Sequence, residues 1–110
     1  MAPARNELLH GTLETLILKT LAAGPRHGYA IARWLEDATG DTLQIEDGSL
    51  YPALYRLENR GWIAAAWTMS ELGRRVKAYR LTAAGRRRLA RSLKEWEQFA
   101  GSVGKVLASR

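Results

Sequence analysis

The spacing of apolar residues changes twice along this chain, and that change constrains the fold more than any other feature. Up to Gly61 apolar residues recur every three or four positions, which is typical of amphipathic helices. Over residues 62–81 two short segments alternate in the manner of strands, and after Thr82 the helical spacing returns. We therefore expect a mostly α protein with a small β-hairpin placed before a long last helix.

Glycine and proline set the end of the first helix. This helix covers residues 8–23 and ends at Gly24 and Pro25, because glycine favours a helix C-terminus and proline cannot continue the hydrogen-bond ladder. Leu18 lies off its apolar face, where it can make a second contact. The face itself consists of Leu9, Leu13, Leu16, Ile17 and Leu21.

Two shorter helices follow. One is expected over residues 27–39, with Gly28, Ile31, Ala32 and Leu35 facing inward. The next starts at Asp47 or Gly48 and continues to Arg60, since Pro52 is tolerated in the early turns of a helix. Its buried stripe consists of Leu50, Leu54 and Leu57.

The hairpin is expected from strands over residues 62–69 and 77–81, joined by a turn over residues 70–75. Ile63, Ala65 and Trp67 would share one face of the first strand. The alanines in this stretch leave a helix as the local alternative. Thr82 is a good N-cap for the last helix.

Three short helices, a hairpin and a long terminal helix form the pattern of a winged helix-turn-helix. That architecture places one helix in the DNA major groove while the hairpin reaches the backbone. We expect residues 1–81 to form a DNA-binding domain and residues 82–110 a dimerisation helix.

The charge is divided unevenly between the two halves of the chain. Residues 1–55 hold four Lys/Arg and seven Asp/Glu, a net charge of −3, whereas residues 56–110 hold thirteen and four, a net of +9, which together give the total of +6. Positive charge gathered in one half is typical of a protein with a polyanionic partner, and a basic surface that only aids solubility is the alternative. Nucleic acid fits better than an anionic membrane, because the basic segments lack the apolar face of an interfacial helix.

The third helix carries the first set of candidate DNA contacts. Ser49 and Tyr51 near its start can hydrogen-bond bases or phosphates, and Tyr55 lies one turn further on. Arg56 can reach a guanine edge or a phosphate, and the sequence does not decide between them. The alternative is that these residues only form the solvated face of an amphipathic helix.

Cations at the hairpin supply the second set. Arg74, Arg75 and Lys77 gather at a tight turn, where their mutual repulsion would be relieved by phosphate. A merely solubilising turn is the alternative. A further run, Arg86, Arg87, Arg88 and Arg91, is interpreted as the solvated face of the last helix.

An ordered set of motifs resembles the phenolic acid repressor (PadR) family. The motifs are His27-Gly28-Tyr29, Gly48-Ser49-Leu50-Tyr51-Pro52-Ala53-Leu54, Arg56-Leu57-Glu58 with Gly61, and Tyr79-Arg80-Leu81-Thr82-Ala83-Ala84-Gly85. The resemblance implies a dimeric transcriptional regulator, usually a repressor, of the short branch with a single C-terminal helix. It also implies DNA contacts by Ser49, Tyr51, Tyr55, Arg74, Arg75 and Lys77. His27 and Gly28 would add a phosphate contact or serve in capping and packing.

The last helix carries an apolar stripe longer than a small core needs, formed by Leu89, Leu93, Trp96, Ala100, Val103 and Leu107. Such a stripe usually marks a partner surface. We expect pairing with a second copy, aided by Leu8, Leu9 or Leu18, and therefore an approximately palindromic operator. Relatives of similar length bind planar drugs between paired tryptophans, so the resemblance also implies a flat aromatic effector at Trp96. Core packing is the alternative for that residue.

Several functional classes find no support in the sequence. The chain has no cysteine and only two histidines, His10 and His27, so we expect neither an enzyme nor a metal or cofactor site. Neither a membrane span nor a signal peptide is expected, which favours the cytoplasm. The remaining alternative to a repressor relieved by a small molecule is a winged helix that docks its basic surface on an acidic protein.

Overall fold

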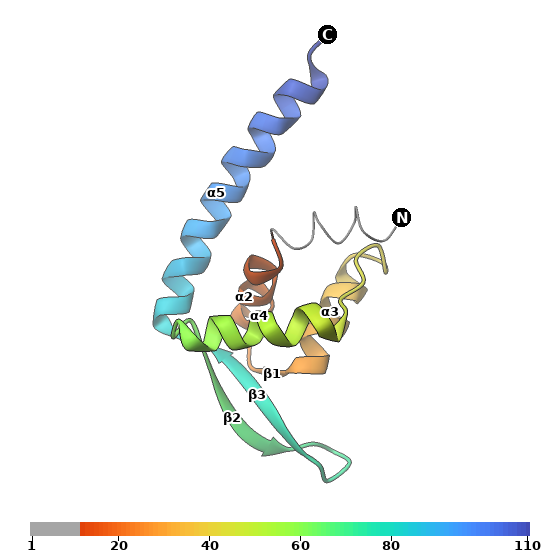
Figure 1. Ribbon diagram of the computed structural model, residues 1–110, viewed down its shortest axis with the longest axis vertical. Helices are drawn as coiled ribbons and strands as arrows, with labels where there is room; N and C mark the ends of the chain where they lie inside the picture. Colours follow the sequence, from red (N-terminus) through yellow and green to blue (C-terminus); the bar gives the residue numbers. More distant parts are fainter. Residues whose placement is uncertain (1–11) are drawn as a thin grey trace.

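The computed structural model describes residues 12–110, which form four helices and a three-stranded antiparallel sheet (Figure 1). Leu8 and Leu9 lie outside the described residues. The mostly α fold with a hairpin and a long terminal helix, expected from the sequence, is confirmed. The elements in order are α2 (Leu13–Ala22), β1 (Arg26–His27), α3 (Gly28–Ala38), α4 (Asp47–Asn59), β2 (Ile63–Met69), β3 (Arg75–Leu81) and α5 (Ala83–Ala108).

The sheet has one strand more than the sequence predicts. Arg26 and His27 form the short strand β1, which pairs with Tyr79 and Ala78 of β3, so that β3 is the central strand of the order β1-β3-β2. The predicted hairpin is present, and β1, which was not predicted, adds a third strand to it. A strand of two residues is too short to show an alternation of apolar and polar positions. Its pairing depends on a partner about fifty residues later in the chain.

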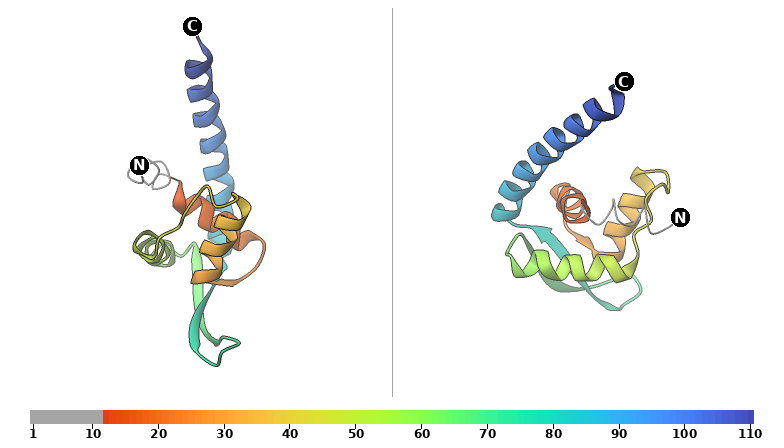
Figure 2. Two further views of the ribbon diagram at one scale, coloured as in Figure 1. Left: turned by 90° about the vertical axis from the view of Figure 1, so that its right-hand side faces the viewer. Right: turned by 45° about the horizontal axis from the view of Figure 1, so that its top comes forward.

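The wing, as we call the hairpin formed by β2 and β3, follows the predicted alternation. Residues 63–69 form a strand, which excludes the helical alternative for this stretch. The second strand starts at Arg75, two residues earlier than expected, because Met69 pairs with Arg75 and Thr68 with Val76. The wing extends below the helices and away from them (Figures 1 and 2).

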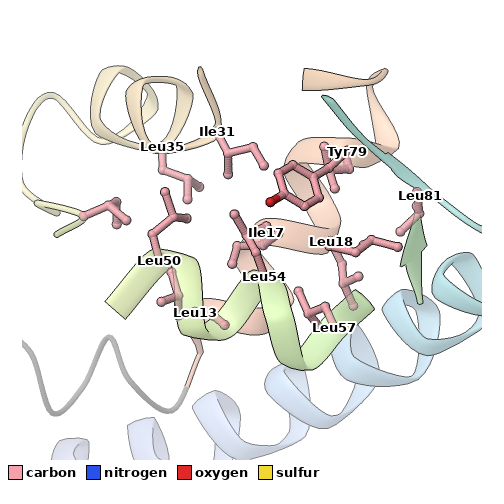
Figure 3. Packing of buried hydrophobic residues seen from close by; sticks show 14 of the residues in the cluster. Leu13, Ile17, Leu18, Ile31, Leu35, Leu50, Leu54, Leu57, Tyr79 and Leu81 are labelled. Atoms are coloured by element: carbon pink, nitrogen blue, oxygen red, sulfur yellow. The ribbon is translucent and has the colours of Figure 1, made fainter. Parts of the chain in front are cut away.

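The core lies between the helices and the base of the wing, and α2 runs through its centre (Figure 3). Leu13, Ile17 and Leu21 are buried as expected, but Leu18 is buried equally well, at 1% exposure. The second contact expected of Leu18 is with this core, because α3, α4, β3 and α5 all pack around α2. Leu18 is therefore not available to a second copy, contrary to the expectation. Leu16 is only partly buried at the edge of this core.

The first turn of α5 is fastened to the start of the wing. The backbone N–H of Thr82 donates to the carbonyl oxygen of Trp62 at 3.1 Å, and its hydroxyl donates to that of Gly61 at 2.6 Å. The same hydroxyl accepts from the N–H of Gly85 at 3.0 Å, which confirms the predicted N-cap. From this anchor α5 passes α2 and then leaves the body of the molecule (Figure 2). Within residues 12–110 no helix has the length and apolar character required to traverse a bilayer.

Candidate nucleic-acid interface

Helix α4 is held by one face and exposes the other. Leu50, Ala53, Leu54 and Leu57 are almost fully buried, as the predicted stripe requires. The opposite side exposes Ser49, Tyr51, Pro52 and Tyr55, and Tyr55 is the most open of these tyrosines at 66% exposure. The core therefore fixes the helix rigidly while its polar and aromatic side remains available.

Tyr51 is placed by a glycine on the neighbouring helix. A Cβ added at Gly28 would lie 2.9 Å from a ring carbon of Tyr51, so a side chain there would displace the Tyr51 ring from this position. Partial burial, and secondarily the carboxylate of Asp47, raises the pKa of the Tyr51 hydroxyl above its usual 10.0. Gly28 is buried, so its role in this surface is to seat Tyr51.

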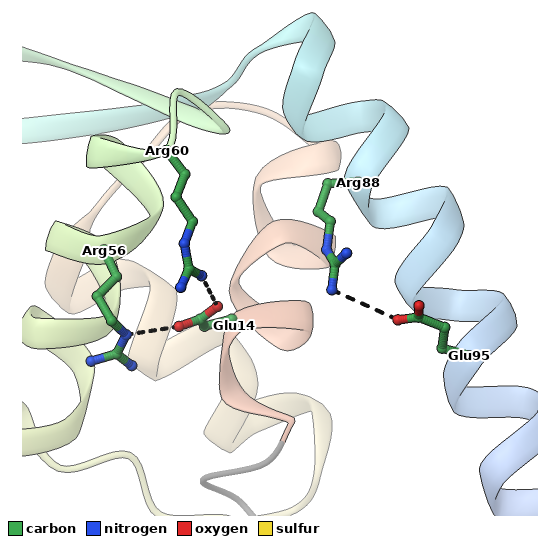
Figure 4. Close-up of polar contacts among 5 residues, drawn as sticks. All are labelled: Glu14, Arg56, Arg60, Arg88 and Glu95. Carbon is green, nitrogen blue, oxygen red and sulfur yellow. Dashed lines mark hydrogen bonds and ion pairs between the residues drawn. The ribbon is translucent and has the colours of Figure 1, made fainter.

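Arg56 points away from the wing, into an ion-pair cluster (Figure 4). Its Nε lies 2.8 Å from Glu14 Oε2, and Arg60 Nη1 lies 2.9 Å from Glu14 Oε1. Ser49 lies two turns before Arg56 and thus on the same flank of α4, while Tyr51 lies on the other flank. These side chains were predicted to share one surface, whereas Arg56 is paired with Glu14 of α2.

The wing turns its cations towards α4. Strand alternation places Arg75 and Lys77 on the same face as the buried Tyr79 and Leu81. Lys77 Nζ lies 3.6 Å from Glu58 Oε1 of α4, which shows the direction of that face. Arg74 is exposed in the turn, where its N–H donates to the Ser70 hydroxyl at 3.2 Å. The tyrosine side of α4 and the cationic face of the wing therefore adjoin at Glu58.

Two exposed aromatic residues beside this surface were not among the predicted DNA contacts. Tyr29 is 57% exposed at the start of α3 and stacks on His27, with ring centroids 5.6 Å apart. Trp67 is 58% exposed on the wing. His27 is half-buried in β1, and its Nδ1 has no hydrogen-bond partner among residues 12–110. The His27-Gly28-Tyr29 motif was the available signal for Tyr29, and its tyrosine went unused.

The apolar stripe of α5 divides into two parts. Leu89 is 7% exposed and belongs to the core of the single chain, so it leaves little surface for a partner. Ala100 is partly buried, and the rest of the stripe is open. The exposed fractions are 37% for Leu93, 49% for Trp96, 64% for Phe99, 38% for Val103 and 80% for Leu107.

Stacked cations join α5 to the end of α4. The guanidinium carbons of Arg60 and Arg88 each lie 5.1 Å from the centre of the Trp62 ring. Arg88 lies 3.7 Å from Glu95, two turns further along α5. Arg88 therefore serves packing and pairing, while Arg86, Arg87 and Arg91 are exposed as the sequence predicts. Nowhere in residues 12–110 do three metal-ligating side chains come together.

Comparison with known proteins places this arrangement in a family. The model described as "Transcriptional regulator PadR-like family" matches residues 17–91. The crystal structure of a PadR family transcriptional regulator from Eggerthella lenta matches with a TM-score of 0.84 and 34% identity, over 99% of this chain and 93% of that one. A transcriptional regulator from Clostridium thermocellum gives 0.83 and 29%, over 90% and 96%. Protein X of Lysinibacillus sphaericus is 31% identical over 94 residues, 86% of each chain. The chain belongs to the PadR-like family of transcriptional regulators.

Proposed function

We propose that the protein is a homodimeric repressor that binds double-stranded DNA sequence-specifically and is released by a small molecule. Helix α4 enters the major groove, and the wing contacts the neighbouring backbone. One observation carries the proposal: the exposed Tyr51 and Tyr55 side of α4 and the Arg75 and Lys77 face of the wing adjoin, with Lys77 3.6 Å from Glu58. A single stretch of duplex can meet both. A repressor acts where the chromosome is, so a cytoplasmic location follows from this function.

Each side chain has a proposed part in binding. Tyr51, seated on Gly28, and Tyr55 face the base edges, while Ser49 meets a phosphate at the start of α4. Arg74, Arg75 and Lys77 neutralise phosphates beside the wing, and His27 adds a phosphate contact near Tyr29. Arg56 joins them only by exchanging Glu14 for a phosphate.

The second copy is proposed to pair through α5. Leu93, Trp96, Ala100, Val103 and Leu107 supply the seam, and Leu89 supports it from within the core. A large apolar strip on a helix that leaves the body is costly to hydrate, and an identical strip is the economical cover. A two-fold dimer sets two α4 helices about one DNA turn apart, so the operator is approximately palindromic.

A planar aromatic effector is proposed between the Trp96 rings of the two copies. Trp96 is half-exposed, and Phe99 lies beside it with ring centroids 6.5 Å apart. Two such pairs related by a two-fold axis would give flat apolar walls for a flat ligand.

The test begins with recovery of DNA fragments that the protein binds in the genome of its source, followed by affinity measurements on the recovered fragments. Arg75→Ala with Lys77→Ala should weaken binding to every duplex. It should also reduce the slope of log K against log salt by about two, because two phosphate contacts are lost. Arg86→Ala with Arg87→Ala removes the same charge from the exposed side of α5 and is the control. Equal losses in both double variants would remove the wing from the interface.

The second candidate is a protein-docking module, favoured only by the exposed cations of the wing. An acidic protein partner would also be salt-sensitive, but it would leave no preferred DNA sequence among the recovered fragments. Recovery of an enriched palindrome therefore decides between the two functions.

A further inference from the structure

One face of the wing covers the core near the start of β2. The same face then continues along the wing beyond the core. Ile63 lies at the base at 2% exposure, but on the same face Trp67 and Met69 are 58% and 62% exposed. Strand alternation makes these three residues neighbours on one side of β2. Trp67 and Met69 are absent from the core cluster and from the residues packed against it. More than half of each of these two side chains is therefore open to solvent in the structure of residues 12–110.

Trp67 lies within cation–π distance of both cations that the wing turns towards α4. The guanidinium carbon of Arg75 lies 4.9 Å from the centre of the Trp67 ring, and Lys77 Nζ lies 5.8 Å from it. Lys77 is the cross-strand partner of Trp67, and Arg75 is that of Met69. The face therefore offers an exposed indole and a thioether flanked by positive charge, a combination that suits a polyanion with an apolar surface between its charges.

We propose that Trp67 contacts DNA directly, lying against the deoxyribose wall of the minor groove next to the groove that α4 enters. Arg75 and Lys77 then take the phosphates on either side. Deoxyribose is the apolar surface that lies between phosphates, and cations are drawn to the negative potential of a narrow minor groove. The assignment rests on the proposed function and adds to it an uncharged contact beside the cationic ones.

The test uses a duplex selected from a random pool by the wild-type protein, with affinities measured over a range of salt. Trp67→Ala should lower affinity roughly tenfold, because an apolar contact of this size is lost. The slope of log K against log salt should stay unchanged, since the indole releases no counterion. Trp67→Phe should recover most of the affinity. Arg75→Ala, in contrast, should reduce the slope by about one.

Matched controls separate the possible outcomes. Thr68→Ala alters the other face of the same strand and should bind like the wild type. Wild-type affinity in Trp67→Ala would overturn the proposal. A loss of slope in Trp67→Ala as large as that in Arg75→Ala would also overturn it, because Trp67 would then only position a cation. If the wild type binds no duplex at all, the proposed function itself fails, which is a different result.

The groove can be tested with base analogues in the duplex segment under the wing. Replacing A·T pairs there by I·C pairs changes the major-groove groups but keeps the minor-groove pattern, whereas G·C adds an amino group to the minor groove. Wild-type affinity should survive the I·C exchange and fall with G·C. Equal losses with both would overturn the minor-groove assignment. Thermal unfolding of each variant without DNA checks that the exposed substitutions leave the fold intact.

Discussion

Gly85 occupies a position in which a side chain has no room. A Cβ there would come within 1.9 Å of the carbonyl oxygen of Trp62, a backbone atom that also accepts the Thr82 N–H. Gly85→Ala should therefore lower the free energy of unfolding by about 2 kcal/mol or more, although alanine favours helices. Urea unfolding measures the change.

Gly101 provides the matched control in the same helix. A Cβ at Gly101 meets nothing within 4 Å, and the residue is exposed in the interior of α5. Gly101→Ala should raise stability by about 0.5–1 kcal/mol, because alanine loses less backbone entropy. Equal effects at the two positions would contradict the close approach of α5 to Trp62.

Tyr79 makes stability sensitive to alkali. Burial, then the charge of Glu58 and the neighbouring Tyr51, raises the pKa of its hydroxyl above 10.0. The unfolded chain then loses this proton at a lower pH than the folded chain, so stability falls as pH rises above the unfolded value and towards the folded one. Tyr79→Phe should make the unfolding free energy fall less steeply above about pH 10. An identical pH dependence in both proteins would contradict the raised pKa.

At the scale of single elements, Glu14 ties α2 to the C-terminal half of α4. One half-buried carboxylate accepts from Arg56 and Arg60 at 2.8 and 2.9 Å. Glu14→Gln should lower the free energy of unfolding by about 0.5–1 kcal/mol at low salt. Each exposed ion pair contributes little, but the substitution weakens two of them at once. The difference should shrink in high salt. Glu71→Gln in the exposed hairpin turn is the control and should change little.

The elements differ in how far the sequence could reveal them. Helices α3 and α4 were predicted because glycine, proline and a leucine spacing mark them locally, and the α5 start was fixed by Thr82. The strand β1 and the pairing of Arg56 with Glu14 were missed, because each depends on a partner more than forty residues away. The spacing of apolar residues within a short segment does not reveal contacts with a distant segment. The proposed site was predictable to the same degree: its helix and its cations were identified, but their directions were not.

At the scale of the whole molecule, α5 links the proposed dimer seam to the proposed DNA surface. Its base is fixed by the Thr82 and Gly61 hydrogen bond and by the stack of Arg60, Trp62 and Arg88. Arg60 directly follows α4, so the direction of α5 and that of α4 are set by the same few contacts. Any change in how two α5 helices cross would therefore change the spacing of the two α4 helices, which gives an effector at Trp96 a physical route to the DNA.

In the proposed dimer, operator binding should depend on the seam. Trp96→Asp should shift the protein towards monomer in sedimentation, because a carboxylate would be buried in an apolar interface. Operator affinity should then fall by roughly a hundredfold or more, since a monomer loses the effective concentration of the second half-site. Gln98→Asp places the same carboxylate on the opposite, exposed side of α5 and should leave both properties unchanged. A Trp96→Asp protein that stays dimeric would move the seam elsewhere, and one that becomes monomeric yet binds the operator as before would show that the two halves recognise DNA independently.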